Sequence, residues 1–484
     1  MNRTRRLAAA CLVAVSLAAC GSTVQVSRSV RSGDALIAPA GTSAAGSTAG
    51  GLQNGLAGAE QVAPTRPSGL ASGSTEQPPQ EPVAGSVGAQ AGEVQVRGTT
   101  ATTANLGIAY LDGGDALFSS FGFSIATGDA KGFSQALIAL INSRGGVLGR
   151  KLVPVWYAAQ ASDATDPKTA EQRACATFTQ DNKVFAAVNA PTDCMVAAKI
   201  PIAPAGGQGA FDAKYFRDHA PYFYGPPFMN TDSLTPVLLD RLQARRFLTP
   251  QSKIGLFYSD TDVQRRFMNR MKQELTSRGL HVAATFARDP NNEVGSSGSG
   301  VLPFRAAGVD RIISFDASIA IFMITADRQG YRPKYALSTY LNLASVQEVV
   351  PPKQQLAGSF GVGWQPRNDV NEQQQIPLPG NRDCETAARN SGQPNPTGSA
   401  AFILWTYCDA IQMFAFGAQH GGGFSPADIR RGLTLAGASF PTALNLSSAY
   451  GLGRYDGARG VREIAYDTGC SCFRYQGTRT YPTN

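Results

Sequence analysis

The side chains that could carry chemistry in this chain of 484 residues are mainly aspartates and cysteines. Shortly after segments that we expect to be strands come Asp193, Asp260, Asp262 and Asp316. An aspartate at the carboxyl end of a parallel strand can contact a ligand, but it can equally cap the next helix. The chain has only 3 histidines, and none lies at the spacing of a zinc site. We therefore expect no metal site, no Ser-His-Asp arrangement and no enzymatic activity.

Two glycine-rich segments lack the residues that would make them functional loops. Residues 145–149 lack the Lys-Ser/Thr ending of a loop that cradles phosphate, so we interpret them as a turn from helix to strand. Residues 295–300 have no strand just before them and do not fit the Gly-x-Ser-x-Gly elbow. We predict a flexible loop there, and neither segment indicates a cofactor.

The first twenty residues have the layout of a cleavable export signal. Three arginines near the start precede the mostly apolar residues 7–17, and small residues then lead to Cys20. The apolar run is too short to span a bilayer, which takes about 20 residues. The arrangement resembles a bacterial lipoprotein signal, in which Cys20 is lipidated and begins the mature chain. An ordinary signal peptide with a chance cysteine is the alternative.

The composition changes after the signal. Residues 21–100 consist largely of Gly, Ser, Ala, Thr, Gln, Val and Pro without an aromatic residue, so they cannot bury enough surface to fold. We predict a disordered tether. The formal charge of +8 falls to about +5 without the three leader arginines, and no basic run suits nucleic acid. Residues 400–419 are apolar but include Asp409, so we predict a buried helix rather than a membrane span.

An even number of cysteines in an exported chain favours disulfides. Beyond Cys11 and Cys20 the chain contains Cys175, Cys194, Cys384, Cys408, Cys470 and Cys472. Many connectivities are possible, and proximity in the sequence suggests Cys175–Cys194 and Cys384–Cys408. The remaining two would form a tight Cys-x-Cys ring, and a strained bridge of this kind is easily reduced.

The elements that position these residues alternate between strand and helix from residue 104 onward. The first series has predicted strands at 105–110, 151–157, 184–188 and 200–203, and helices at 130–142 and from Asp166-Pro167. The second has predicted strands at 253–258, 281–286, 311–315 and 335–338, and helices at 263–277 and 318–329. Such alternation predicts parallel sheets covered on both faces. We expect lobe 1 at 101–231 and 366–440, and lobe 2 at 232–365 and 441–484.

Two motifs of the first series resemble a known family. The sequence Asn-Ser-Arg-Gly-Gly-Val-Leu-Gly-Arg-Lys at 142–151, followed by Asp-Pro-Lys-Thr-Ala at 166–170, resembles the leucine/isoleucine/valine-binding-protein family. Its members are type I periplasmic solute receptors of ABC transporters. The resemblance implies an α/β fold of two doubly wound parallel-sheet lobes, joined by a hinge of three crossovers and closing on a ligand. Ligands of open α/β sheets do bind outside the carboxyl ends of the strands.

The resemblance also implies the residues that would contact the ligand. An aromatic ring, Phe121, would lie over it, and Thr192 and Asp193 would lie in the loop that holds a carboxylate. The full implied set is Phe121, Thr192, Asp193, Ala205, Gly206, Gly207, Asp316 and Thr339. Two departures argue against an unmodified α-amino acid: Asp193 would repel a carboxylate, and Ser338-Thr339-Tyr340 supplies no acidic group for an ammonium.

The resemblance implies an extracytoplasmic, lipid-anchored, monomeric protein that captures a small molecule, delivers it to an ABC permease and catalyses nothing. We expect neither a nucleic-acid partner nor a cofactor. One rival interpretation is a ligand sensor for a membrane signalling partner. The other is an extracellular enzyme.

Overall fold

A computed structural model describes residues 96–120, 124–160, 162–163, 166–207, 209–349 and 353–483. The expectations about the export signal, about Cys20 and about nearly all of the tether concern residues outside this set. Phe121 also lies outside the described residues.

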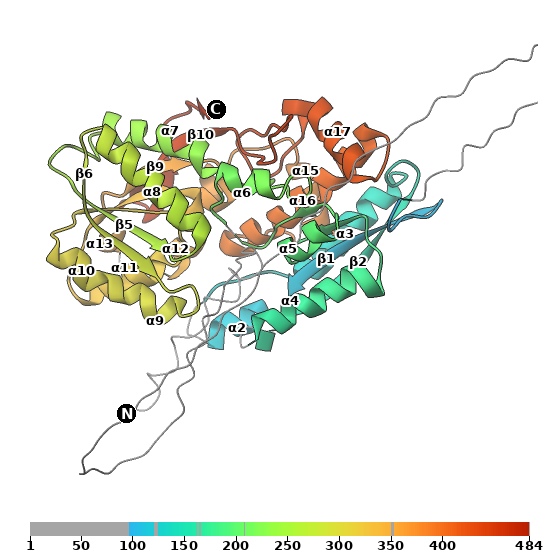
Figure 1. Ribbon diagram of the computed structural model, residues 1–484, viewed down its shortest axis with the longest axis horizontal. Helices are drawn as coiled ribbons and strands as arrows, with labels where there is room; N and C mark the ends of the chain where they lie inside the picture. The colour runs from blue at the N-terminus through green and yellow to red at the C-terminus, as the bar shows by residue number, and fades with distance from the viewer. Residues whose placement is uncertain are drawn as a thin grey trace, which may run out of the picture. The chain divides into compact units, whose positions relative to one another are not determined.

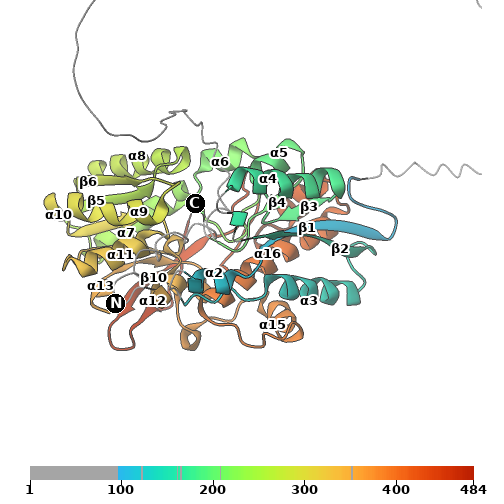
Figure 2. The same ribbon diagram turned by 90° about the horizontal axis from the view of Figure 1, so that it is seen from below.

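The first sheet has four parallel strands in the order β2-β1-β3-β4. Its strands are β1 (Thr103–Leu111), β2 (Lys151–Ala159), β3 (Ala186–Val188) and β4 (Ile202–Ala203). Six of the nine residues of β1 and all three of β3 are buried, because these inner strands consist mostly of apolar residues. Figure 2 shows helices on both faces of this sheet, with α4 and α5 on one side and α3, α15 and α16 on the other. The layering is that of a doubly wound sheet.

The helices of this part of the chain begin where local capping signals predict. The Asp129 side chain caps α3 (Ala130–Ser143), and the Asp166 side chain caps α4 (Pro167–Ala176), which has Pro at its first turn. Four further helices are α5 (Thr192–Ala197), α15 (Asn381–Asn390), α16 (Gly398–Gly421) and α17 (Pro426–Ala436). Both α15 and α16 pack against α3, and α16 also contacts β3. Segments far apart in sequence thus build one layer.

At the start of β2, two successive positions on its outer edge offer no backbone N–H to another strand. Lys151 N donates inward to Thr102 O, so the N–H groups of Leu152 and every second residue after it point outward. Asn142 occupies both backbone groups of Leu152: its Nδ2 donates to Leu152 O at 2.9 Å, and its Oδ1 accepts from Leu152 N at 2.8 Å. The next outward position is Pro154, which has no N–H.

The second sheet has eight strands, which follow the order β11-β10-β9-β8-β7-β5-β6, with β12 beside β10 (Figure 1). Its strands are β5 (Lys253–Ser259), β6 (His281–Arg288), β7 (Arg311–Ser314), β8 (Lys334–Ser338), β9 (Phe360–Gly363), β10 (Gly460–Asp467), β11 (Cys472–Tyr475) and β12 (Tyr481–Pro482). Figure 1 shows α7 (Thr231–Ala244) and α8 (Asp262–Ser277) on one side of it, and α10 (Val301–Ala306) and α11 (Ile319–Arg328) on the other. Shorter helices are α2 (Gly114–Ser120), α6 (Ala213–Asp218), α12 (Leu343–Val349), α13 (Lys353–Leu356) and α14 (Pro366–Asp369).

Three pairings in the second sheet depart from the expected parallel arrangement. β10 is antiparallel to β9, β11 and β12. The chain leaves the sheet after Gly363 and returns at Gly460 near the same end, as the pairing of Arg462 with Gly363 shows, so β10 must run backward. A turn of four residues then links β10 to β11, which is too short for a parallel crossover.

Residues 295–300 correct a second expectation. They belong to α9 (Glu293–Ser297) and a short 3-10 helix (Gly298–Gly300), not to a flexible loop. The Asn292 side chain caps this segment by accepting from Gly295 N at 3.1 Å. A Cβ at Gly300 would lie 2.8 Å from the Phe286 ring, so the glycine permits close packing here. Tertiary contact overrides the low helix propensity of glycine.

The longest helix, α16, is apolar enough to cross a membrane by length and composition among the described residues, but 83% of its most apolar window is buried inside the protein. That burial matches the prediction of a buried helix.

Three disulfides join neighbouring elements of the described chain: Cys175–Cys194 links α4 to α5, Cys384–Cys408 links α15 to α16, and Cys470–Cys472 closes the turn before β11. These are the pairs that proximity in the sequence favours.

Candidate functional site

The carboxyl ends of β1, β3 and β4 are tied together by one side chain, Asn189. It follows β3 directly, is 7% exposed and has a φ of 57°. Its Nδ2 donates to Ala109 O at 3.3 Å and to the Tyr407 hydroxyl at 2.9 Å, while its Oδ1 accepts from Ala205 N at 3.4 Å. The Tyr407 hydroxyl donates to Ala109 O at 2.8 Å. Asn189 and Tyr407 thus hold the loops from which ligand contacts are expected.

Neither Asn189 nor Tyr407 was predicted from the sequence to belong to the site. An asparagine just after a strand is a weak signal for a left-handed residue, which Asn tolerates better than most side chains. Nothing local indicates that a tyrosine 218 residues later would meet it.

We expect the replacement Asn189→Ala to destabilise the protein by about 1–3 kcal/mol, because it leaves buried partners without their hydrogen bonds. Urea unfolding would measure this change. Asn182→Ala is a matched control, since Asn182 is exposed and its Nδ2 bonds only locally, to Thr177 O. An equal effect of the two replacements would contradict the role given to Asn189.

The loop Ala205-Gly206-Gly207 contacts α16. Gly206 has a φ of 75°, and its N–H donates to Thr406 Oγ1 at 2.7 Å. Since Ala205 N donates to Asn189, the N–H groups of the first two loop residues are used within the protein. Gly207 is buried beside them. Two of the three backbone donors expected to serve a ligand therefore hold the loop in place.

Thr192 and Asp193 begin α5. Thr192 is 4% exposed, whereas the Asp193 side chain is 51% exposed and its Oδ1 lies 3.4 Å from His219 Nε2. The other ring nitrogen, His219 Nδ1, is 2.8 Å from Tyr215 O. Burial favours the neutral ring, but the hydrogen bonds to Asp193 and Tyr215 outweigh it and raise the pKa of His219. In this structure the partner of the Asp193 carboxylate is an imidazole.

Asp316 follows β7 and forms a buried ion pair with Arg288 at the end of β6. Arg288 Nε lies 2.8 Å from Asp316 Oδ2, and the two side chains are 7% and 5% exposed. Asp316 Oδ1 also accepts from Arg288 Nη2 at 3.3 Å and from Ser318 N at 2.9 Å. The arginine balances this carboxylate, so Asp316 offers no excess negative charge to a ligand.

Thr339, the last residue of the implied set, connects β8 to the segment after β9. Its Oγ1 donates to Asp369 Oδ2 at 3.1 Å and accepts from Trp364 N at 2.9 Å. The implied contacts therefore fall into two groups within the described chain. Thr192, Ala205, Gly206 and Gly207 follow strands of the first sheet, whereas Asp316 and Thr339 follow strands of the second.

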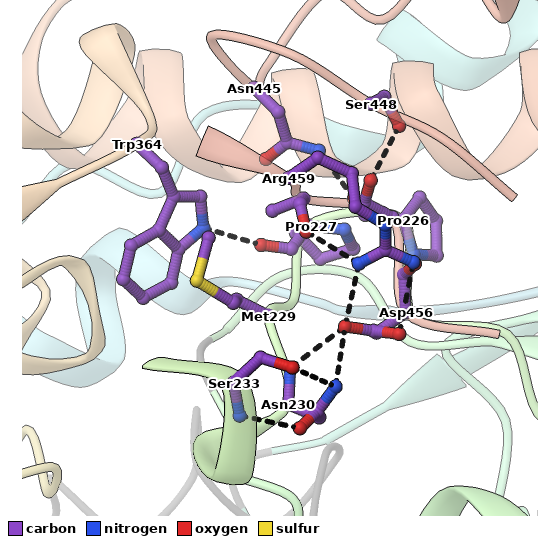
Figure 3. A network of polar contacts seen from close by, with 12 residues as sticks. Pro226, Pro227, Met229, Asn230, Ser233, Trp364, Asn445, Ser448, Asp456 and Arg459 are labelled. Atoms are coloured by element: carbon purple, nitrogen blue, oxygen red, sulfur yellow. Dashed lines mark hydrogen bonds and ion pairs between the residues drawn. The ribbon is translucent and has the colours of Figure 1, made fainter. Parts of the chain in front are cut away.

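Three crossovers between the two sheets meet in one polar junction (Figure 3). They are residues 225–230 between β4 and β5, residues 364–366 after β9, and residues 445–459 before β10. Trp364 Nε1 donates to Pro227 O at 3.0 Å and Asn445 Nδ2 donates to Pro226 O at 2.6 Å, so the first crossover is bound by both others. The second and third are linked because Leu446 N donates to Trp364 O at 2.8 Å.

Asp456 adds a charged centre to this junction. Its Oδ2 accepts from Asn230 N at 3.0 Å and from Arg459 Nη1 at 2.8 Å, as Figure 3 shows. Tyr340 packs over the junction, with its ring centroid 5.0 Å from that of Trp364 and 6.5 Å from that of Phe228. Side chains from both halves of the chain therefore enclose the crossovers.

Two buried carboxyl groups flank the junction. Asp369 Oδ2 accepts from the Tyr475 hydroxyl and from Gln365 N, each at 2.8 Å. Asp409, in α16, accepts from Thr442 Oγ1 and Ala443 N, each at 2.6 Å. Burial raises the pKa of Asp369 and that of Asp409 to about 7, although these hydrogen bonds oppose the shift. Both groups titrate near neutral pH.

Within the described ranges, no cluster of three His, Cys, Asp or Glu side chains could hold a metal ion. What the geometry offers is two sets of strand-end loops joined by a bonded three-segment junction.

Several solved structures have a similar fold. A substrate-binding protein of an ABC transporter from Aeropyrum pernix is 14% identical with a TM-score of 0.59, and the match covers 79% of this chain and 96% of that one. LivJ of Streptococcus pneumoniae, solved with isoleucine, is 12% identical with a TM-score of 0.54, over 79% of this chain and 100% of its own. A solute-binding protein of R. palustris, solved with 4-hydroxybenzoate, is 12% identical with a TM-score of 0.56, over 79% and 97%.

At these identities the likeness establishes the fold, which is that of the type I periplasmic binding proteins. Residues 119–460 match the family model described as periplasmic binding protein. The chain belongs to this family, and the fold class inferred from the sequence is confirmed. A search of curated proteins gave no match.

Proposed function

We propose that this protein is a lipid-anchored, extracytoplasmic solute receptor that captures a small molecule between two lobes and delivers it to an ABC permease. The observation that carries the proposal is the bonded junction of three crossovers in a chain of the periplasmic binding protein family. Lobe 1 comprises residues 101–231 and 366–440, and lobe 2 comprises 232–365 and 441–484. Cys20 bears the lipid, and residues 21–100 tether the lobes to it.

The ligand that we propose is a small organic solute without an α-ammonium group. In the loops after β7 and β8 an ammonium would meet no unbalanced carboxylate, because Asp316 is balanced by Arg288 and Thr339 is engaged by Asp369. Thr192, Asp193 and the aromatic Phe121 remain as the contacts that we propose. Among the structural relatives, the R. palustris protein holds 4-hydroxybenzoate, which also lacks an ammonium, although Asp193 of this chain would repel its carboxylate.

Mass spectrometry of the protein purified under native conditions tests the function. We expect a bound small molecule to be released on denaturation. We also expect the same compound, added back at 100 times its Kd, to stabilise the chain by about 2.7 kcal/mol. If no compound of a broad panel of solutes shifts the melting temperature, the receptor function is wrong. If a compound binds but is chemically converted, the protein is an enzyme.

A pair of variants tests Asp193. If its carboxylate contacts the ligand, Asp193→Asn weakens binding about tenfold, the loss of about 1.4 kcal/mol expected for one charged hydrogen bond. The control is His219→Gln, which removes the imidazole partner but leaves the carboxylate in place. Equal affinities of the two variants in calorimetry would assign Asp193 a structural role only.

A further inference from the structure

A cluster of arginines surrounds Tyr481, near the end of the chain. Arg241 Cζ lies 4.4 Å from the Tyr481 ring centroid and Arg479 Cζ lies 4.9 Å from it. Arg245, one turn after Arg241 at the end of α7, donates through Nε to Glu463 Oε2 at 2.9 Å. Figure 1 shows α7, β10 and the C-terminus next to one another.

Two more arginines complete this group. Arg462 Nε donates to Thr480 Oγ1 at 3.2 Å, and Arg246 follows Arg245 directly. We call Arg241, Arg245, Arg246, Arg462 and Arg479 the arginine cluster. Arg241 lies in α7, and Arg245 and Arg246 follow this helix. The end of α7 is joined to β10 because Arg241 and Arg245 contact Glu463, and the segment of Arg479 is joined to β10 because β12 pairs with it.

The arginine cluster carries more positive charge than its neighbours balance. The carboxylate inside it is Glu463, whose side chain is 2% exposed. Asp240, which precedes Arg241 in the sequence, pairs with Arg278 at 2.6 Å, and Asp310 pairs with Arg311 at 3.3 Å. Five arginines against one glutamate give these six side chains a formal charge of +4. Arg245, Arg246 and Arg479 are exposed to solvent.

The chemistry of the arginine cluster suits phosphate groups. A guanidinium presents a planar fork of donors to phosphate oxygens. Contact with one tyrosine ring already orders Arg241 and Arg479, so binding costs them less side-chain entropy. Charges spread over three elements fit a surface of many phosphates better than one small anion.

We propose that the arginine cluster rests against the anionic phospholipid headgroups of the membrane to which the chain is tethered. The cluster itself is independent of the proposed transport function, but the choice of occupant rests on the proposed lipid at Cys20. If residues 21–100 form the flexible tether that we propose, their typical reach is about 50 Å, which keeps the folded part close to the membrane surface. Clustered arginines near an anionic membrane surface are attracted to it. An acidic protein partner would lack this enforced proximity.

Vesicle flotation tests the proposal with the mature chain carrying Cys20→Ser, so that no lipid is attached. We expect binding to vesicles of phosphatidylglycerol and phosphatidylcholine, weakening with added sodium chloride, and no binding to phosphatidylcholine alone. The double variant Arg246→Gln/Arg479→Gln should lose about 25-fold in affinity, at about fivefold for each arginine. The variant should fold, because it keeps Arg241 and Arg245, the arginines that contact the buried Glu463.

The control Arg328→Gln/Arg389→Gln removes the same charge from exposed arginines on α11 and α15. It should keep vesicle binding within about twofold, the change expected from net charge alone. Equal losses in both double variants would overturn the proposal, as would absence of binding to anionic vesicles at low salt. Binding to detergent-solubilised membrane protein but not to vesicles would also overturn it and indicate an acidic protein partner. The melting-temperature shift by the solute should persist in every variant, which separates failure here from failure of the receptor function.

Discussion

The free energy of unfolding should fall between about pH 4 and pH 7, and replacing Asp369 and Asp409 by asparagine should remove most of this decrease. Burial raises the pKa of each carboxyl from its usual 3.8 to about 7 in the folded chain. A raised carboxyl pKa stabilises the fold below the unfolded pKa, and this contribution falls as the pH rises, up to the folded pKa. A folded pKa about three pH units above the unfolded pKa changes the free energy of unfolding by about 4 kcal/mol for each group. The two groups together account for about 8 kcal/mol.

Urea unfolding near pH 4 and near pH 8 measures the difference in the free energy of unfolding between the two conditions. Each replacement should reduce this difference by about 4 kcal/mol. Because the two residues have different partners, their effects should add. Asp262→Asn is the control, since that side chain is 72% exposed and should leave the slope unchanged. A double variant with the slope of the original protein would contradict the prediction.

Trp364→Ala should destabilise the protein by about 3–5 kcal/mol, the usual cost of deleting a fully buried tryptophan. The side chain is 0% exposed, packs against Tyr340 and donates to Pro227 O across the junction. Since the junction joins the segments that would move on lobe closure, we expect solute affinity to fall as well. Calorimetry of unfolding and of binding would measure both changes.

One replacement at Trp364 separates packing from hydrogen bonding, and one at Trp156 serves as a control. Trp364→Phe keeps an aromatic ring but loses the indole N–H, so about 1 kcal/mol should be lost from that hydrogen bond. Trp156→Ala deletes a half-buried tryptophan from the edge strand β2 and should cost less than Trp364→Ala. If Trp156→Ala is the more costly replacement, the junction does not have the importance that we give it.

The sequence predicted those features that depend on neighbouring residues. Asp166 and Pro167 start α4 where the capping pattern places it, and the strand at 253–258 is within one residue of β5. Residues 295–300 were predicted wrongly because their helix depends on Phe286 and Asn292, whereas glycine content alone favours a loop. The reversed direction of β10 could not be predicted either, since it follows from where the third crossover re-enters the sheet.

The candidate site depends even more on contacts between distant segments, which a local sequence pattern does not predict. Family resemblance indicated Asp193 and Asp316, but their partners His219 and Arg288 come from other elements and change what the two carboxylates can offer. Asn189 has its main partner 218 residues away, so no local pattern marks it. Fold and family could thus be inferred from short motifs, while charge balance at the site depends on contacts between distant segments.

The blocked edge of β2 has a consequence for a protein concentrated on a surface. Tethered copies of one chain meet far more often than copies in solution, and an open strand edge would then invite strand-to-strand polymerisation. Asn142 occupies both outward groups of Leu152, and Pro154 has no donor at the next outward position. If the chain is anchored as we propose, this half of the β2 edge offers no N–H group on which the strand of a neighbouring copy could begin to pair.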